Sequence, residues 1–459
     1  MGLDPTLRNN EGEFAVALRN SAAALVALIA GVLCAGGIAA PAQAAIEIQW
    51  WHAMTGPLND RLNEIADGFN KSQADYVIKP VYKGTYTETL TGAVAAFRAK
   101  QNPAIVQVFE VGTATMMGAK GAVYPVFELM RDNGIAFDPK NYLAAVTSYY
   151  TDTNGQMLSF PFNSSTPILY YNKAMFKAAG LDPNEPPKTW NDVEAYGKKI
   201  LASGAKCGFT TAWPSWVNIE NLSALHNVPI ATKANGFGGL DTELKINAPL
   251  HVRHIANLAR WQQDKLFDYG GRGNTADGKF PSGECAIYMG SSAARAAILT
   301  NSKSFEVGFG MLPYYDDVAG APRNSIIGGA TLWVLKGRPD AEYKGVAKFM
   351  DYLSTAAVQT KWHQQTGYLP ITNASYELSK TEGFYDKNPG ADVSIKQMTL
   401  NPPTENSKGL RLGSFVQVRE VIEEEVEAAL QGKKPAQEAL DSAVKRGNDL
   451  LRAFEAANK

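Results

Sequence analysis

The order of strand and helix patterns near the amino end constrains the fold most strongly. Five segments alternate between β-type and helical periodicity, at residues 46–50, 58–69, 76–82, 86–100 and 104–109. Strand, helix, strand, helix, strand is the order of a doubly wound parallel sheet, where ligands bind beyond the carboxyl ends of the strands. Glu110 and segment 82–86 stand at such ends, so we expect a binding cleft there.

A second α/β pattern follows. Strand patterns cover residues 168–171, 285–289 and 325–335, and Thr189 is expected to cap a helix that begins at Trp190. The carboxyl end reads as helical, and the three glutamates at 423–425 are predicted to form a solvated face. Since 459 residues exceed the usual size of one domain, the sequence predicts two α/β lobes.

Residues 1–44 are predicted to be a cleavable signal peptide. Residues 21–40 form a weakly polar to apolar run, Arg19 precedes it, and Ala42-x-Ala44 is a small-x-small cleavage site. The run is also about as long as the ~20 residues of a membrane span, so an uncleaved anchor is the alternative. Cleavage would leave a soluble exported protein with Cys207 and Cys285, whose pairing the sequence leaves open.

Local signatures of catalysis and metal binding are incomplete. His251 and His254 have metal-like spacing, but no acidic residue completes a zinc motif, so surface histidines without a metal are expected. Residues 273–279 imitate a phosphate loop, yet Phe280 replaces the required Ser or Thr. The 44 basic and 45 acidic side chains leave no excess charge to attract nucleic acid. Paired glycosidase carboxylates leave no local motif, so an enzyme stays an open alternative.

Seven segments together resemble a known family. They are residues 51–54 (WHAM), 82–86 (YKGTY), 107–117 (QVFEVGTATMM), 161–172 (PFNSSTPILYYN), 326–333 (IIGGATLW), 362–371 (WHQQTGYLPI) and 408–413 (KGLRLG). From residue 46 to the carboxyl terminus, the chain resembles the periplasmic sn-glycerol-3-phosphate-binding receptors of Ugp-type ABC importers. These belong to the maltose-binding-like extracellular solute-binding proteins.

The resemblance implies a two-lobed α/β periplasmic binding protein, with crossing hinge segments and a ligand cleft between the lobes. Lobe 1 would comprise residues 45–164 plus about 325–370, and lobe 2 residues 165–324 plus about 371–459. The implied function is to bind sn-glycerol 3-phosphate or a glycerophosphodiester such as glycerophosphocholine, without catalysis or cofactor. A monomeric receptor would present this ligand to the permease subunits. The alternatives are an oligosaccharide receptor and, less favoured, a secreted phosphodiesterase or glycosidase.

The resemblance also implies a set of ligand contacts. They are Tyr86, Glu110, Ser165, Trp213, Ser291, Gly329, Tyr368 and Arg419. Because a guanidinium can hold phosphate oxygens bidentately, Arg419 is expected to bind the phosphate. Glu110 is expected to accept hydrogen bonds from the glycerol hydroxyls at the opposite end of the ligand. Structural alternatives are an ion pair of Arg419 with Glu420 or Glu423, and a strand bend at Gly329.

Overall fold

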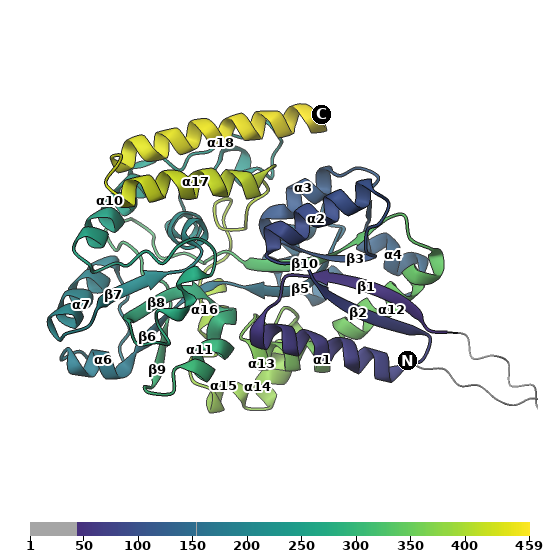
Figure 1. Ribbon diagram of the computed structural model, residues 1–459, viewed down its shortest axis with the longest axis horizontal. Helices are drawn as coiled ribbons and strands as arrows, with labels where there is room; N and C mark the ends of the chain where they lie inside the picture. Colours follow the sequence, from purple (N-terminus) through teal and green to yellow (C-terminus); the bar gives the residue numbers. More distant parts are fainter. Residues whose placement is uncertain (1–43, 153) are drawn as a thin grey trace, which may run out of the picture. The chain divides into compact units, whose positions relative to one another are not determined.

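The computed structural model describes residues 44–152 and 154–459, so the predicted signal peptide lies, apart from Ala44, outside the described residues. Residues Ala45–Lys459 form one unit, built around two β-sheets (Figure 1). In the part of the chain that the structure describes, no helix combines the length and apolarity that a membrane crossing requires.

The first sheet contains six strands. They are β1 (Ile46–His52), β2 (Tyr76–Tyr82), β3 (Ile105–Phe109), β4 (Val123–Tyr124), β5 (Phe160–Ser165) and β10 (Gly328–Leu335). β1 pairs in parallel with both β2 and β3, which confirms the alternation predicted from the sequence. β10 then pairs antiparallel with β3, β4 and β5, so the complete sheet is mixed rather than wholly parallel.

Helices cover both faces of this sheet. Figure 1 shows α2 (Tyr86–Arg98) on one side and α1 (Gly56–Ser72) on the other. The predicted helical spacing is confirmed in α1, because Leu62, Ile65 and Phe69 are buried in one core with residues of α12 (Asp340–Ser354). Leu90 of α2 belongs to a different core cluster, as expected for a sheet with helices on both faces.

The second sheet has four strands in the order β7-β8-β6-β9. They are β6 (Pro167–Asn172), β7 (Cys207–Thr211), β8 (Cys285–Ser291) and β9 (Val307–Gly310). β7 and β8 are parallel, with Cys207 directly opposite Cys285 at a Cα–Cα distance of 4.6 Å. The two cysteines form a disulfide, which answers the question that the sequence left open.

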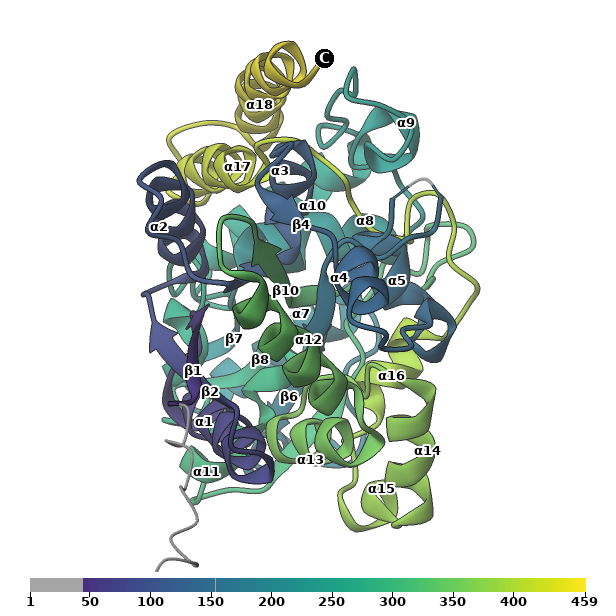
Figure 2. The same ribbon diagram turned by 90° about the vertical axis from the view of Figure 1, so that its right-hand side faces the viewer.

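The remaining helices surround the two sheets (Figure 2). They are α3 (Thr113–Gly118), α4 (Val126–Asp132), α5 (Ala144–Tyr150), α6 (Lys173–Ala178), α7 (Trp190–Ala202), α8 (Leu222–Leu225), α9 (Thr232–Asn235), α10 (Pro249–Gln263), α11 (Arg295–Asn301), α13 (Ala356–Thr366), α14 (Asn373–Thr381), α15 (Phe384–Lys387), α16 (Val393–Met398), α17 (Phe415–Leu430) and α18 (Ala436–Asn458). Short 3-10 turns are η1 (Glu110–Gly112), η2 (Pro139–Asn141), η4 (Thr275–Gly278) and η5 (Ser292–Ala294), and η3 (Trp216–Asn221) is a π-helical turn. Thr189 caps α7 as predicted, since its hydroxyl accepts a hydrogen bond from the Asp192 N–H.

Two interpretations of charged and polar side chains are wrong. Glu425, predicted to be solvated, is buried and lies 2.6 Å from the ammonium of Lys434, because α17 packs against α18 on that side. His251 and His254, predicted to be surface residues, are fully buried on the inner face of α10. Histidine spacing alone does not reveal which face of a helix is covered by the rest of the chain.

The chain crosses between the sheets in neighbouring segments. Thr166 joins β5 to β6, and its hydroxyl lies 2.7 Å from the hydroxyl of Ser325 and 3.0 Å from the carbonyl oxygen of Ile326, just before β10. The N–H of Leu369 donates to the carbonyl of Ser164 at 2.7 Å. Adjacent crossings of this kind are what the expected hinge requires, while the exact limits of the two lobes stay a prediction.

Candidate functional site

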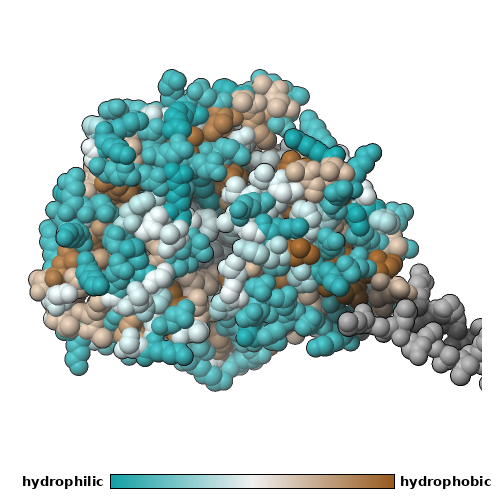
Figure 3. All heavy atoms as spheres, viewed as in Figure 1, coloured by the Kyte–Doolittle hydropathy of each residue, from teal (hydrophilic) through white to brown (hydrophobic). Residues whose placement is uncertain are grey.

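A cavity of about 350 Å³ lies between the two sheets. The space-filling view shows the surface hollowed there (Figure 3). The parallel strands of the first sheet deliver residues to it as predicted: Met54 follows β1, Tyr82 ends β2, and Glu110 follows β3. The opposite wall comes from the end of β8 and from the following side chains: Trp213, Trp216, Asn274, Asp277, Ala293, Ala294, Ala296 and Ala297.

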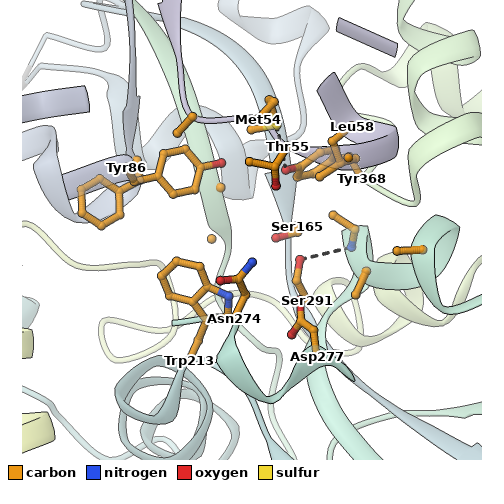
Figure 4. A pocket seen from close by; sticks show the side chains of 18 of the residues that line it. Met54, Thr55, Leu58, Tyr86, Ser165, Trp213, Asn274, Asp277, Ser291 and Tyr368 are labelled. Carbon is orange, nitrogen blue, oxygen red and sulfur yellow. Dashed lines mark hydrogen bonds between the residues drawn. The ribbon is translucent and has the colours of Figure 1, made fainter. Parts of the chain in front are cut away.

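All eight residues that the resemblance implied line this one cavity, and five of them, Tyr86, Ser165, Trp213, Ser291 and Tyr368, are labelled in Figure 4. The other three are Glu110, Gly329 and Arg419. The eight residues come from strands of both sheets, from α2 and α17, and from segments that connect such elements, so parts far apart in the sequence meet here. That each of them contacts a ligand stays a prediction.

Arg419 is the centre of a buried ionic cluster. Its Nη2 donates to a carboxylate oxygen of Glu110 at 2.7 Å, and its Nε and Nη2 donate to the two oxygens of Glu220 at 2.7 and 2.8 Å. All three side chains are more than nine-tenths buried. Sequence reasoning missed Glu220, because it lies on the π-helical turn η3 and no motif marks it.

The expected separation of Glu110 and Arg419 is therefore wrong. The two groups are in direct contact instead of holding opposite ends of a ligand. The structural alternative also named the wrong partners, since Arg419 pairs with Glu110 and Glu220 and not with Glu420 or Glu423. A sequence contains no information on which distant carboxylate will reach a buried guanidinium.

The cluster contains one positive group, Arg419, and two carboxylates, Glu110 and Glu220. Burial by itself lowers the pKa of Arg419, but the attraction of Glu220 and Glu110 outweighs it and raises the pKa, so the guanidinium stays charged. The pKa of Glu110 is raised, mainly by burial. The charge of Arg419 opposes this shift but does not cancel it, because the negative charge of Glu220 also raises the pKa of Glu110. Among the described residues, Nη1 of Arg419 has no hydrogen-bond partner and is available to a ligand oxygen.

Neutral hydrogen-bond donors gather in another part of the cavity. Ser165 ends β5, and Ser291 ends β8 with its Oγ accepting the N–H of Ala293 at 3.1 Å, so the Ser291 hydroxyl hydrogen is free to point elsewhere. Tyr368 is held by stacking on Trp362, with ring centroids 5.5 Å apart. These hydroxyls can donate to a polar ligand group.

The start of α1 reinforces this part of the wall. Residues 55–58 line the cavity, and Thr55 at the N-cap makes no side-chain capping hydrogen bond. The first N–H groups of a helix lack intrahelical partners and lie at the positive end of the helix dipole. Together with the neighbouring hydroxyls, this end of a 17-residue helix favours an anionic ligand group.

Gly329 has a backbone reason to be glycine. Its φ is +102°, and a Cβ would lie 1.9 Å from the carbonyl oxygen of Asn163 on the paired strand β5. The β5–β10 register shifts directly afterwards, between Ala330 and Thr331. The strand-bend interpretation of Gly329 is thus confirmed. Gly329 also lines the cavity, so the strand bend and a ligand contact at this residue are compatible.

Two aromatic rings face each other across the cavity. Tyr86 stacks on Phe109 at 5.3 Å and its hydroxyl accepts a hydrogen bond from Asn163 at 3.0 Å. Trp213 lies opposite, with ring centroids 6.5 Å apart. Its φ of +50° is strained for a non-glycine residue, and its N–H is fixed on the carbonyl of Gly273 at 2.6 Å. Such strain is retained where surrounding contacts hold a side chain in a particular direction.

Comparison with known proteins agrees with this architecture. The family model described as "Bacterial extracellular solute-binding protein" matches residues 64–392. The chain is 51% identical over 423 residues to the sn-glycerol-3-phosphate-binding periplasmic protein UgpB of Pectobacterium atrosepticum, covering 92% of this chain and 95% of that protein. It is 50% identical over 419 residues to the protein of the same name from Salmonella typhimurium, covering 91% and 95%.

Solved structures share the fold at lower identity. UgpB from Mycobacterium tuberculosis in complex with glycerophosphocholine has a TM-score of 0.75 at 20% identity, covering 89% of this chain and 98% of that one. Maltose-bound MalE3 of T. maritima has a TM-score of 0.72 at 18% identity, covering 88% and 100%. The two-lobed, maltose-binding-like fold expected from the sequence is confirmed, and the chain belongs to the bacterial extracellular solute-binding protein family.

Proposed function

We propose that this protein is the periplasmic receptor of an ABC importer and binds sn-glycerol 3-phosphate or its small diesters, such as glycerophosphocholine. The observation that carries the proposal is the convergence of all eight implied contact residues on one cavity. The names of the relatives at 50–51% identity support the ligand and the compartment. At about 350 Å³, the cavity lies at the small end of the range of roughly 300–1,000 Å³ for ligand pockets, which suits such a ligand better than an oligosaccharide.

The phosphate is assigned to the donors around the start of α1, not to Arg419. Glu110 and Glu220 already surround Arg419 with two negative charges for one positive charge, so a phosphate placed there would be repelled. The hydroxyls of Ser165, Ser291 and Tyr368 offer an uncharged alternative. At the start of α1, Pro57 has no N–H and the N–H of Asn59 already bonds to Thr55, so the N–H groups of Gly56 and Leu58 add to these donors. This assignment moves the phosphate away from Arg419, where the sequence analysis expected it, and keeps the glycerol hydroxyls at Glu110.

The glycerol hydroxyls are assigned to the ionic cluster. A hydroxyl can donate to the carboxylate of Glu110 and accept from Nη1 of Arg419 at the same time. Because the cluster is already ordered by its own hydrogen bonds, ligand binding costs little additional side-chain entropy there.

The receptor acts by binding and closure, without catalysis. The cavity has walls from both sheets, so a bound ligand favours the state in which the two walls are close. We assign it to the periplasm as a monomer that delivers its ligand to the permease subunits, after removal of residues 1–44.

Calorimetric titration tests the proposal. The purified protein without its first 44 residues is titrated with sn-glycerol 3-phosphate, glycerophosphocholine and maltotriose, and only the first two should bind. Ser165→Ala should weaken binding about five- to fifty-fold, since one hydrogen bond to a charged group is lost. Ser164→Ala is the matched control, because the buried hydroxyl of Ser164 has no hydrogen-bond partner among the described residues and does not line the cavity. Tight binding of maltotriose, or none of either phosphate ester, would overturn the proposal.

A further inference from the structure

The segment that imitates a phosphate loop lies at the cavity. Asn274 and Asp277 line the wall on the same side as Trp213 and Ser291 (Figure 4). Lys279, the residue that would contact phosphate in a true phosphate loop, instead pairs with Asp268 at 2.6 Å and Glu284 at 3.1 Å. The segment therefore brings a carboxylate to the cavity and keeps its cation elsewhere.

Asp277 has no cationic partner in the part of the chain that the structure describes. One of its oxygens accepts a hydrogen bond from the hydroxyl of Tyr288 at 2.6 Å, and this is its only side-chain contact of that kind among the described residues. Half-burial raises the pKa of Asp277 to about 6, so it is mostly ionised at neutral pH. A half-buried carboxylate that faces a cavity without a counter-ion is unfavourable unless a ligand supplies the positive charge.

The other charged groups of the wall do not supply this charge. Within the described lining, the charged side chains are Glu110, Asp277 and Arg419, and Arg419 is already shared by Glu110 and Glu220. The wall thus carries net negative charge, which disfavours the dianion of a phosphate monoester more than a zwitterion. A ligand with one phosphate charge and one positive charge matches it better.

Aromatic rings accompany the carboxylate. Trp213 is a partly exposed ring of the cavity wall, whereas Tyr288 is buried and holds Asp277 through its hydroxyl. The loop that carries Asp277 packs on Trp213, because the backbone N–H of Trp213 donates to the carbonyl of Gly273. Aromatic faces beside a carboxylate attract alkylammonium groups, because the ring quadrupole and the negative charge act together.

Resting on the proposed function, we infer that Asp277 and the ring of Trp213 form a subsite for the cationic head group of a glycerophosphodiester, with Tyr288 positioning Asp277. Asp277 is then a specificity-determining residue. It favours diesters with a quaternary or primary ammonium alcohol over diesters with a neutral alcohol and over sn-glycerol 3-phosphate itself.

The first test uses the unaltered protein and three ligands in calorimetric titration. They are glycerophosphocholine, its neutral carbon isostere in which the trimethylammonium nitrogen is replaced by carbon, and glycerophosphoglycerol. Glycerophosphocholine should bind at least about ten-fold more tightly than the isostere, which differs only in charge. Equal affinity of the charged ligand and its isostere would overturn the inference.

The second test is Asp277→Asn, which keeps the size of the side chain and an oxygen that can accept from Tyr288. It should weaken glycerophosphocholine about ten-fold or more, leave glycerophosphoglycerol within about three-fold, and strengthen sn-glycerol 3-phosphate. Asn274→Ala, on the same segment but uncharged, should change the three affinities alike. Circular dichroism checks that each variant is folded.

The outcomes separate this inference from the proposed function. If glycerophosphocholine, glycerophosphoglycerol and sn-glycerol 3-phosphate all bind and Asp277→Asn changes their affinities by the same factor, the cationic subsite is wrong and the proposed function stands. If the unaltered protein binds none of these phosphate esters, both are wrong.

Discussion

Replacing Arg419 should lower the stability of the folded protein and not only weaken ligand binding. In Arg419→Met, Glu110 and Glu220 lose three charge-assisted hydrogen bonds of 2.7–2.8 Å and stay buried without a counter-ion. Breaking a buried ion pair by removing one partner costs about 3–5 kcal/mol. We therefore expect the free energy of unfolding to fall by about that amount at pH 7.5, measured by urea unfolding with tryptophan fluorescence.

The sign of the pH dependence identifies the cause. In the variant, the unpaired buried carboxyls have a folded-state pKa above the unfolded value, so the folded state binds more protons than the unfolded state. Stability lost by Arg419→Met should then be partly regained as the pH falls from 7.5 towards 5. A cavity left by a shortened side chain would show no such recovery.

Neutralising the partners provides the matched control. Arg419→Met combined with Glu110→Gln and Glu220→Gln should recover stability to within about 2 kcal/mol of the unaltered protein, because no buried charge is left unpaired. Arg131→Met, which breaks an exposed pair with Asp132, should leave stability near that of the unaltered protein. The reasoning is refuted if Arg419→Met is as stable as the unaltered protein, or if the triple variant is less stable than Arg419→Met alone.

Three further outcomes follow from the backbone, the disulfide and the buried histidines. Gly329→Ala should lower the free energy of unfolding by about 2 kcal/mol or more, since its φ is +102° and the new Cβ would clash, whereas Gly92→Ala in α2 has open space and should be neutral or slightly stabilising in the same urea assay. Replacing both disulfide cysteines by serine should cost about 2–4 kcal/mol, and a reductant should reproduce the loss in the unaltered protein but not in the variant. Burial lowers the pKa of every histidine, so the folded state binds fewer protons than the unfolded state and the urea midpoint should fall as the pH drops from about 6.5 towards 4. The raised pKa values of Glu110, Asp277, Glu342 and Glu423 oppose this but are fewer, and a midpoint higher at pH 5 than at pH 7.5 would contradict it. The histidines are His52, His226, His251, His254 and His363.

Local sequence patterns predicted helices and strands correctly where the apolar residues of the pattern lie on the face that the fold buries. The helix over residues 58–69 is present in α1 because its apolar spacing matches the face that the sheet covers. Thr189 and Asp192 form a capping box, a signal contained within four residues. The strand predicted from residue 325 begins only at Gly328, because residues 325–327 cross between the sheets and bond to Thr166 and Asn221.

The candidate site was found residue by residue from the resemblance, but its electrostatics were not. Arg419 and Glu110 are 309 positions apart, and their contact depends on α17 reaching the end of β3. Glu220 was missed because it lies on a short irregular turn without a motif, and Asp277 because its segment was judged only as a phosphate loop. In that segment Lys279 pairs with Asp268 and Glu284, while the carboxylate of Asp277 reaches the cavity wall.

The position of the ionic cluster bears on how the proposed receptor closes. Glu110 follows a strand of the first sheet, Glu220 follows a strand of the second, and Arg419 of α17 binds both. This bridge forms without a ligand, so it cannot by itself make closure depend on the ligand. A ligand favours the closed state only if it binds that state more tightly than the open state. The ligand must therefore contribute contacts that exist only when the walls meet. In the proposed arrangement these are one hydroxyl bound by Glu110 and Nη1 of Arg419 together, and one phosphate between α1 and Ser291 on opposite walls.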